Sequence, residues 1–185
     1  MSEEVLVRQC APTLAGLKVG NIFSCIGETG PELIREIGAL NRRLVPRGIR
    51  LIPIRKASRS TLIYVYRPAM LPAYVFKPEA QALLRRCGYI GSSADAYVVQ
   101  LICRLASSES FPHEIGLFLG YPAEDVKGFI EHHAEDCKCC GCWKVYGDAD
   151  EAQKTFCKYR KCVQVYCECL RKGVPLEKLA VKTAG

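Results

Sequence analysis

The feature that most constrains the fold is a long amphipathic segment near the end of the chain, residues 149–171. Apolar residues recur along it at alternating spacings of four and three: Ala152, Phe156, Tyr159, Val163, Tyr166 and Leu170. This spacing places them on one face of an α-helix. Asp148 and Glu151 match a capping box at its start, and Gly173 suits its end. The segment therefore predicts one long helix that packs through this face.

The first part of the chain has a different pattern. Residues 20–26, 49–54 and 61–66 are rich in apolar, β-branched and aromatic side chains and predict strands, although Pro53 weakens the second. A helix is expected over 31–45, where apolar residues repeat with helical spacing. This order predicts a small mixed sheet with β-α-β-β connectivity.

Helical patterns follow the prolines at 68, 72 and 78, near residues 78–87, 93–107, 113–119 and 123–134. The expected fold class is α+β, with the small N-terminal mixed β-sheet packed with a helical C-terminal part. The division falls between residues 1–76 and 77–185, within one compact unit. The 185 residues are enough for such a core.

The compartment follows from what the chain lacks. No stretch approaches the roughly 18–20 apolar residues that a membrane helix needs. The start, Met1 to Val5, is acidic and leads into no apolar signal region. We therefore expect a cytoplasmic protein with no membrane association.

Twelve cysteines need an explanation in that compartment, and eight of them lie between Cys137 and Cys169. A reducing cytoplasm favours free thiols, metal ligands or redox groups over structural disulfides. Scattered cysteines, such as Cys10, are most often small buried hydrophobes. The cluster is therefore the candidate site.

Two C-x-x-C pairs interleave in the loop 137–142, and Gly141 follows the first pair as in a metal knuckle. Zinc and cubane iron–sulfur clusters each take four ligands, so either cofactor needs residues beyond one pair. The cysteines of the long helix spread over several of its faces, and His133 lies just upstream. The candidate metal ligands are Cys137, Cys139, Cys140, Cys142, Cys162 and His133.

The same loop could act without metal, because C-x-x-C pairs exchange thiols with disulfides and Lys138 and Lys144 would favour the thiolates. The first hypothesis is thus a metal-binding or thiol-redox accessory protein. Two alternatives stay open. One is a non-catalytic protein-interaction domain whose cysteines are structural. The other is a thiol-dependent enzyme, for which Cys10 is a candidate nucleophile without an identified histidine partner.

Charge is uneven along the chain, whose net charge is +7. From Arg42 to Arg86 there are eleven Lys and Arg residues against one acid. Arg55, Lys56 and Arg59 in its hairpin tip are candidate contacts for an anion or for an acidic protein, such as an electron carrier. The helix-turn-helix-like stretch 113–133 is acidic, so we expect no nucleic-acid binding.

Other short motifs are incomplete. His113 and Glu114 do not form H-E-x-x-H, because position 117 is Leu, and they suit the start of a short helix instead. The turn 27–30 can bind an anion at the following helix, but it lacks the full phosphate-loop and dinucleotide fingerprints.

Three blocks resemble a known family. They are Cys10-Ala11-Pro12-Thr13-Leu14-Ala15-Gly16-Leu17-Lys18, Pro112-His113-Glu114-Ile115-Gly116-Leu117-Phe118-Leu119-Gly120-Tyr121-Pro122 and Trp143-Lys144-Val145-Tyr146. With these blocks the chain resembles an uncharacterised family of anaerobic, mostly clostridial Firmicutes, a domain of unknown function. The resemblance spans most of the chain and implies no established activity. It does imply an anaerobe's cytoplasm, which suits free thiols and oxygen-sensitive clusters.

Overall fold

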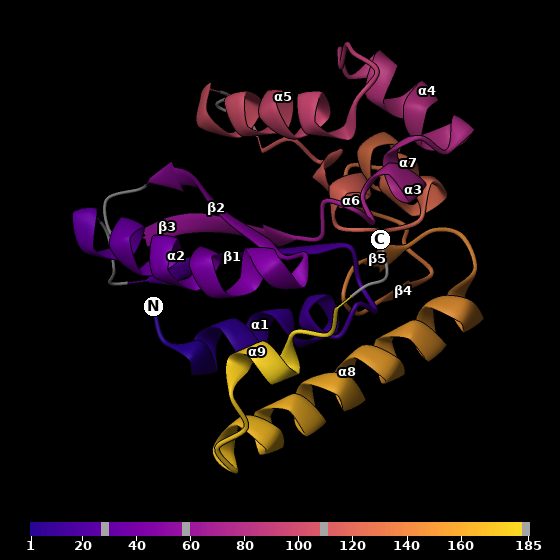
Figure 1. Cartoon of the computed structure of the whole chain (residues 1–185). Helices are drawn as coiled ribbons and strands as arrows, with labels where there is room; N and C mark the ends of the chain where they lie inside the picture. Colours follow the sequence, from indigo (N-terminus) through magenta and orange to yellow (C-terminus); the bar gives the residue numbers. More distant parts are fainter. Residues whose placement is uncertain (27–29, 57–59, 108–110, 183–185) are drawn as a thin grey trace. The chain divides into compact units, whose positions relative to one another are not determined.

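The computed structural model describes residues 1–26, 30–56, 60–107 and 111–182. The chain divides into two units: unit 1 comprises Met1–Ala69 and Tyr159–Gly185, and unit 2 comprises Met70–Lys158 (Figure 1). Strands near the N-terminus and helices through the C-terminal part confirm the predicted α+β class. The division at residue 76 remains a prediction.

The sheet of unit 1 has three strands, β1 (Gly20–Ile26), β2 (Arg50–Lys56) and β3 (Ser60–Tyr66), in the order β1-β3-β2. Both neighbouring pairs are antiparallel. The sheet is therefore fully antiparallel, whereas a mixed sheet was predicted. The reason is that β2 follows its helix to the far side of β3 and never pairs with β1. Pro53 is tolerated because β2 is an edge strand, and the register shifts between Pro53 and Arg55.

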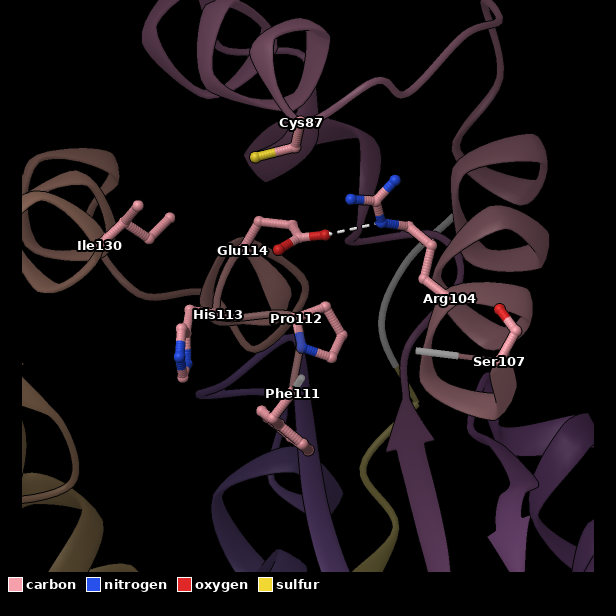
Figure 2. Close-up of a pocket in the computed structure, with 8 residues that line it drawn as sticks. All are labelled: Cys87, Arg104, Ser107, Phe111, Pro112, His113, Glu114 and Ile130. Atoms are coloured by element: carbon pink, nitrogen blue, oxygen red, sulfur yellow. Dashed lines mark hydrogen bonds and ion pairs between the residues drawn. The ribbon is translucent and has the colours of Figure 1, made fainter. Parts of the chain in front are cut away.

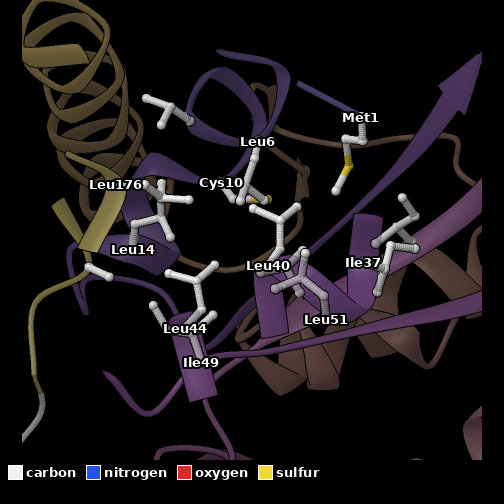
Figure 3. Close-up of a cluster of buried hydrophobic side chains, with 14 of the residues drawn as sticks. Met1, Leu6, Cys10, Leu14, Ile37, Leu40, Leu44, Ile49, Leu51 and Leu176 are labelled. Atoms are coloured by element: carbon white, nitrogen blue, oxygen red, sulfur yellow. The ribbon is translucent and has the colours of Figure 1, made fainter. Parts of the chain in front are cut away.

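Helices cover one face of this sheet. They are α1 (Glu3–Leu14), α2 (Pro31–Leu44) and the short α9 (Leu176–Leu179), and a 3-10 turn, η1 (Val45–Arg47), follows α2. Figure 3 shows their buried side chains meeting those of the strands, among them Leu6, Cys10, Leu14, Ile37, Leu40, Leu44, Leu51 and Leu176. Tyr166 and Leu170 of α8 (Ala149–Arg171) pack against this core, as the amphipathic pattern predicted.

Arg43 of α2 connects α1 and α9 within unit 1. Its Nη1 donates to Glu3 Oε1 at 2.5 Å, and its Nε donates to Glu177. The hydrogen bond from Arg43 is the main reason why the pKa of Glu177 falls to about 2. A carboxylate with a depressed folded-state pKa adds stability above its unfolded pKa, and that stability is lost as the pH falls through the folded pKa.

Glu177→Gln is therefore expected to destabilise unit 1 near neutral pH. The difference in the free energy of unfolding between variant and wild type should shrink as the pH falls from 4.5 to about 2. The side chain is 39% exposed, so we expect at most about 1 kcal/mol. Urea denaturation followed by circular dichroism, repeated across this pH range, measures the loss of stability. Glu4→Gln, which removes only a surface pair with Arg8, is the control. A difference that does not change with pH would contradict the assignment.

Unit 2 is mostly helical. Its helices are α3 (Pro72–Val75), α4 (Pro78–Arg86), α5 (Ala94–Ser107), α6 (Ile115–Phe118), α7 (Ala123–Glu131) and the first turns of α8. A two-stranded hairpin, β4 (Cys139–Cys140) with β5 (Lys144–Val145), lies between α7 and α8. The helices predicted near 78–87, 93–107 and 123–134 are thus confirmed with shifts of a few residues at their ends. Among the described residues, no helix is long and apolar enough to cross a membrane.

Candidate functional site

The predicted cysteine loop forms the β4–β5 hairpin. Cys139 pairs with Val145 and Cys140 pairs with Lys144 across the two strands. The backbone N–H of Gly141 donates to the Trp143 carbonyl at 3.0 Å and closes the turn. The cysteines therefore sit on ordered backbone rather than on an irregular loop.

Asp125 of α7 holds the hairpin in place. This carboxylate is 2% exposed and accepts three hydrogen bonds, from Trp143 Nε1 at 2.7 Å and from the backbone N–H groups of Tyr146 at 2.7 Å and Gly147 at 2.8 Å. Asp125 lies in the first turn of its helix, where the helix dipole favours an acidic side chain. Its bonds to the hairpin could not be predicted, because its partners come from residues about twenty positions later.

Aromatic rings fix the hairpin from both sides. The Trp143 ring stacks on Tyr121 at 4.8 Å between centroids and meets the Phe156 ring edge-on at 4.6 Å. A Cβ added to Gly141 would lie 2.3 Å from the Phe156 ring, so only glycine fits there without a shift of the aromatic side chain. Gly141 thus has a packing role that the metal-knuckle interpretation did not include.

Each C-x-x-C pair combines an exposed cysteine with a half-buried one. Cys140 and Cys142 are exposed, whereas Cys137 and Cys139 are half-buried. Cys139 packs against the cluster of Val145, Ala152 and Phe156. The hairpin therefore presents two accessible thiols, each with a less accessible thiol three residues earlier.

The predicted metal ligands fall in both units. Cys137, Cys139, Cys140, Cys142 and His133 belong to unit 2, whereas Cys162 belongs to unit 1, where it is buried and burial raises its thiol pKa to about 11. Over residues 1–26, 30–56, 60–107 and 111–182, no group of three or more His, Cys, Asp or Glu side chains is placed to hold a metal ion. The six-residue ligand set, with its zinc or iron–sulfur cofactor, stays a prediction.

The other candidates are placed as follows. Arg55 and Lys56 end β2, and Arg59 lies outside the described residues. Cys10 is fully buried in α1, and burial raises its thiol pKa to about 12, which makes it a poor nucleophile. Arg67, one of the eleven basic residues counted between 42 and 86, is buried and contributes nothing to a basic surface.

Unit 2 also contains a pocket of about 510 Å³ that the sequence did not reveal (Figure 2). It lies among the end of α4, the helix α5, the segment before α6 and the helix α7. The side chains that line it are Cys87, Arg104, Ser107, Phe111, Pro112, His113, Glu114 and Ile130. Its size is that of pockets that hold small molecules.

Glu114 is the buried charge of this pocket, with 4% of its surface exposed. Its Oε1 accepts hydrogen bonds from Arg104 Nε at 3.0 Å and from the Tyr89 hydroxyl at 3.2 Å. Burial and then the Glu114 charge raise the pKa of Tyr89, so its hydroxyl stays protonated and donates. The Arg104 guanidinium lies 5.1 Å from the centre of the Tyr89 ring, in a cation–π contact.

In the sequence, His113 and Glu114 stood out only as an incomplete zinc-binding motif. It did not single out Arg104, Tyr89 or Cys87, which lie 10 to 27 residues away from Glu114. The hydrophobic pattern placed their helices, but no local motif connects them. The one available signal was that Arg104 falls in a helix whose other residues are mostly apolar.

Comparison with known proteins shows which family the chain belongs to. The model of a family described as "Protein of unknown function (DUF3793)" matches residues 6–180, which include all three resembling blocks. No curated protein and no solved structure matches the chain. The resemblance to an uncharacterised family is therefore confirmed, and the chain belongs to the DUF3793 family of proteins of unknown function.

Proposed function

We propose that the hairpin of residues 137–142 is a thiol–disulfide exchange site and that the protein is a thiol-redox accessory protein of the cytoplasm. The observation that carries the proposal is the pairing of thiols by accessibility. Exposed Cys140 and Cys142 are each preceded, three residues earlier, by half-buried Cys137 and Cys139. An exchange site needs one thiol that a substrate can reach and a second thiol nearby to resolve the mixed disulfide.

The chemistry balances as a two-electron transfer. The Cys140 thiolate attacks a disulfide of a protein or a small molecule, forms a mixed disulfide and releases the first substrate thiol. The Cys137 thiolate then attacks Cys140 Sγ, which releases the second substrate thiol and leaves a Cys137–Cys140 disulfide. The hairpin gives up two electrons and two protons, and the substrate disulfide takes them up. Cys142 and Cys139 can run the same sequence.

Two lysine ammonium groups lie beside the hairpin. Lys138 Nζ donates to the Gly147 carbonyl at 2.7 Å and Lys144 Nζ donates to the Ala134 carbonyl at 2.5 Å. Both ammonium groups are therefore held beside the hairpin without a carboxylate to neutralise them in these two bonds. The net charge of +7 favours an acidic protein, such as an electron carrier, as the partner.

The metal-binding version of this hypothesis has weaker support, because the described residues gather no three ligands around one point. The two versions differ in one measurement. Zinc or an iron–sulfur cluster held by the hairpin would appear as stoichiometric metal after anaerobic purification. Its loss on replacing both Cys137 and Cys140 by Ser would identify these residues as ligands.

A redox titration tests the exchange proposal. The protein is equilibrated anaerobically with mixtures of reduced and oxidised glutathione, quenched with iodoacetamide and mapped by mass spectrometry. We expect a reversible disulfide within residues 137–142 that disappears when Cys140 and Cys142 are both replaced by Ser. Cys103→Ser, which removes an exposed cysteine of α5, is the matched control and should change nothing. If all four hairpin thiols remain alkylated under oxidising mixtures, the proposal is wrong.

A further inference from the structure

The pocket of unit 2 contains a buried carboxylate with an unused acceptor. Both hydrogen bonds to the Glu114 side chain end on Oε1, and Oε2 accepts none from the part of the chain that the structure describes. Figure 2 shows this second oxygen turned away from Arg104. Glu114 lines the pocket, and Oε2 is not among the side-chain atoms sealed from solvent. A ligand in the pocket can therefore donate a charged N–H group to it.

Arg104 supplies the opposite charge beside it. Its Nε is used by Glu114, but its two terminal nitrogens donate to no side chain or carbonyl among the described residues. In Figure 2 these nitrogens lie on the side of the guanidinium that faces Cys87. The side chain is 40% exposed, so a solute can reach it. A guanidinium with free terminal N–H groups binds a carboxylate in a fork geometry.

Apart from His113, the other described residues that line the pocket carry no charge. Phe111, Pro112 and Ile130 are apolar. Burial, followed by the Glu114 charge, raises the pKa of the Cys87 thiol, so it stays protonated and is not a nucleophile near neutral pH. The pocket is therefore built for binding, with one free acceptor and one free donor group next to each other.

We propose that this pocket binds a small zwitterion, an α-amino acid, with its ammonium group on Glu114 Oε2 and its carboxylate on the terminal nitrogens of Arg104. An α-amino acid carries the two charges on one carbon, as the neighbouring Glu114 and Arg104 require. A simple anion would face the Glu114 carboxylate, and a simple cation would face the Arg104 guanidinium. The apolar walls favour an aliphatic or aromatic side chain. This site is separate from the proposed exchange hairpin and does not depend on it.

Binding of the free amino acids tests the proposal directly. Each of the twenty common L-amino acids is added to the full-length protein, and hits from thermal shift are measured by calorimetry. We expect at least one apolar amino acid to bind with a Kd below about 1 mM. Its N-acetyl and C-amide derivatives, which each remove one charge, should bind about tenfold to a hundredfold more weakly, as expected for loss of a charged hydrogen bond.

Two substitutions locate the binding. Glu114→Gln keeps an acceptor for Arg104 and Tyr89 but removes the charge that faces the ammonium group, and Arg104→Lys removes the fork. Each should weaken binding tenfold or more. The matched control is Glu131→Gln, which removes surface ion pairs with Arg86 and Lys127, does not line the pocket and should leave binding unchanged.

Three outcomes would overturn the proposal. One is that no amino acid binds at millimolar concentration. Another is that the N-acetyl derivative binds as well as the parent, which would make the pocket a simple anion site. The third is that the C-amide binds as well, which would make it a cation site. These outcomes are read on the unmodified protein, so a variant that fails to fold does not prevent a decision.

Discussion

Asp125→Ala is expected to release the cysteine hairpin and to destabilise unit 2 by about 4 kcal/mol. The change leaves three donors without their acceptor, Trp143 Nε1 and the backbone N–H groups of Tyr146 and Gly147. Hydrogen bonds to a charged group contribute about 1.5–3 kcal/mol each, and their sum is reduced because the loosened hairpin regains contact with water.

Trp143 makes this measurement direct, because it is the single tryptophan of the chain and lies within the hairpin. Urea denaturation followed by its fluorescence gives the stability around the hairpin, and the emission of the folded variant reports whether the ring still packs on Tyr121 and Phe156. Iodoacetamide labelling adds a second readout. Cys137 and Cys139, half-buried in the wild type, should react nearly as fast as Cys140 and Cys142 in the variant.

Asp148→Ala is the matched control. Asp148 is an aspartate of the same unit that accepts one backbone hydrogen bond, from Glu151 at 3.0 Å at the start of α8. Losing such a cap costs about 1 kcal/mol. If Asp125→Ala costs no more than Asp148→Ala and leaves the labelling pattern unchanged, Asp125 is not what holds the hairpin.

The example of Asp125 shows which part of this fold could be predicted from sequence. The helix that carries Asp125 followed from local spacing, as did the strand at residues 20–26 and the long helix at 149–171, whose bounds are those predicted. These elements have strong periodic patterns, which are properties of neighbouring residues. The bonds from Asp125 to the hairpin depend on residues that meet only after folding.

The helix α1 was missed for a local reason. Ser2 accepts a hydrogen bond from the Val5 N–H as an N-cap, and Glu3 and Glu4 occupy the first turn, so a start signal was present. Pro12 near its end is a residue that usually interrupts helices. In the structure Pro12 lies in the last turn of the helix, where the fold tolerates it, and the buried residues of α1 complete the core of unit 1.

The candidate site was predicted only in part. The cysteine hairpin could be found because its residues are adjacent in the sequence, although which thiols are exposed could not. The pocket could not be found, because Glu114, Arg104 and Tyr89 come from three separate segments. Charge counting was misleading for Arg67, because a residue type does not reveal whether the fold buries it.

Arg67→Met is expected to destabilise unit 1 by about 3–5 kcal/mol, because it removes three hydrogen bonds from a buried cation to backbone carbonyls. Arg67 is 0% exposed, and its Nε donates to Thr13 O at 2.6 Å. Its Nη2 donates to Leu14 O at 2.6 Å and to Val181 O at 2.8 Å. The first two carbonyls end α1, where a helix lacks its own donors and where its dipole favours a cation.

The same side chain also holds the segment that follows α9, because Val181 accepts from Arg67 and its own N–H donates to Leu14 O at 3.0 Å. Limited proteolysis should therefore cut the Arg67→Met chain after α9 faster than the wild type. Arg67→Lys should fall between the two, since one ammonium group cannot replace donors spread over a planar guanidinium.

Arg47→Met separates this role from the general loss of an arginine. Arg47 Nε donates a hydrogen bond to one nearby carbonyl, Ala180 O at 2.9 Å, and the side chain is only half-buried. Its replacement should cost about 1 kcal/mol, the usual net value of one such bond. Equal losses for the two methionine variants in urea denaturation would contradict the anchoring role of Arg67. A loss at least twice as large for Arg67→Met, with faster proteolysis after α9, would mean that one buried cation joins the end of α1 to the segment that follows α9.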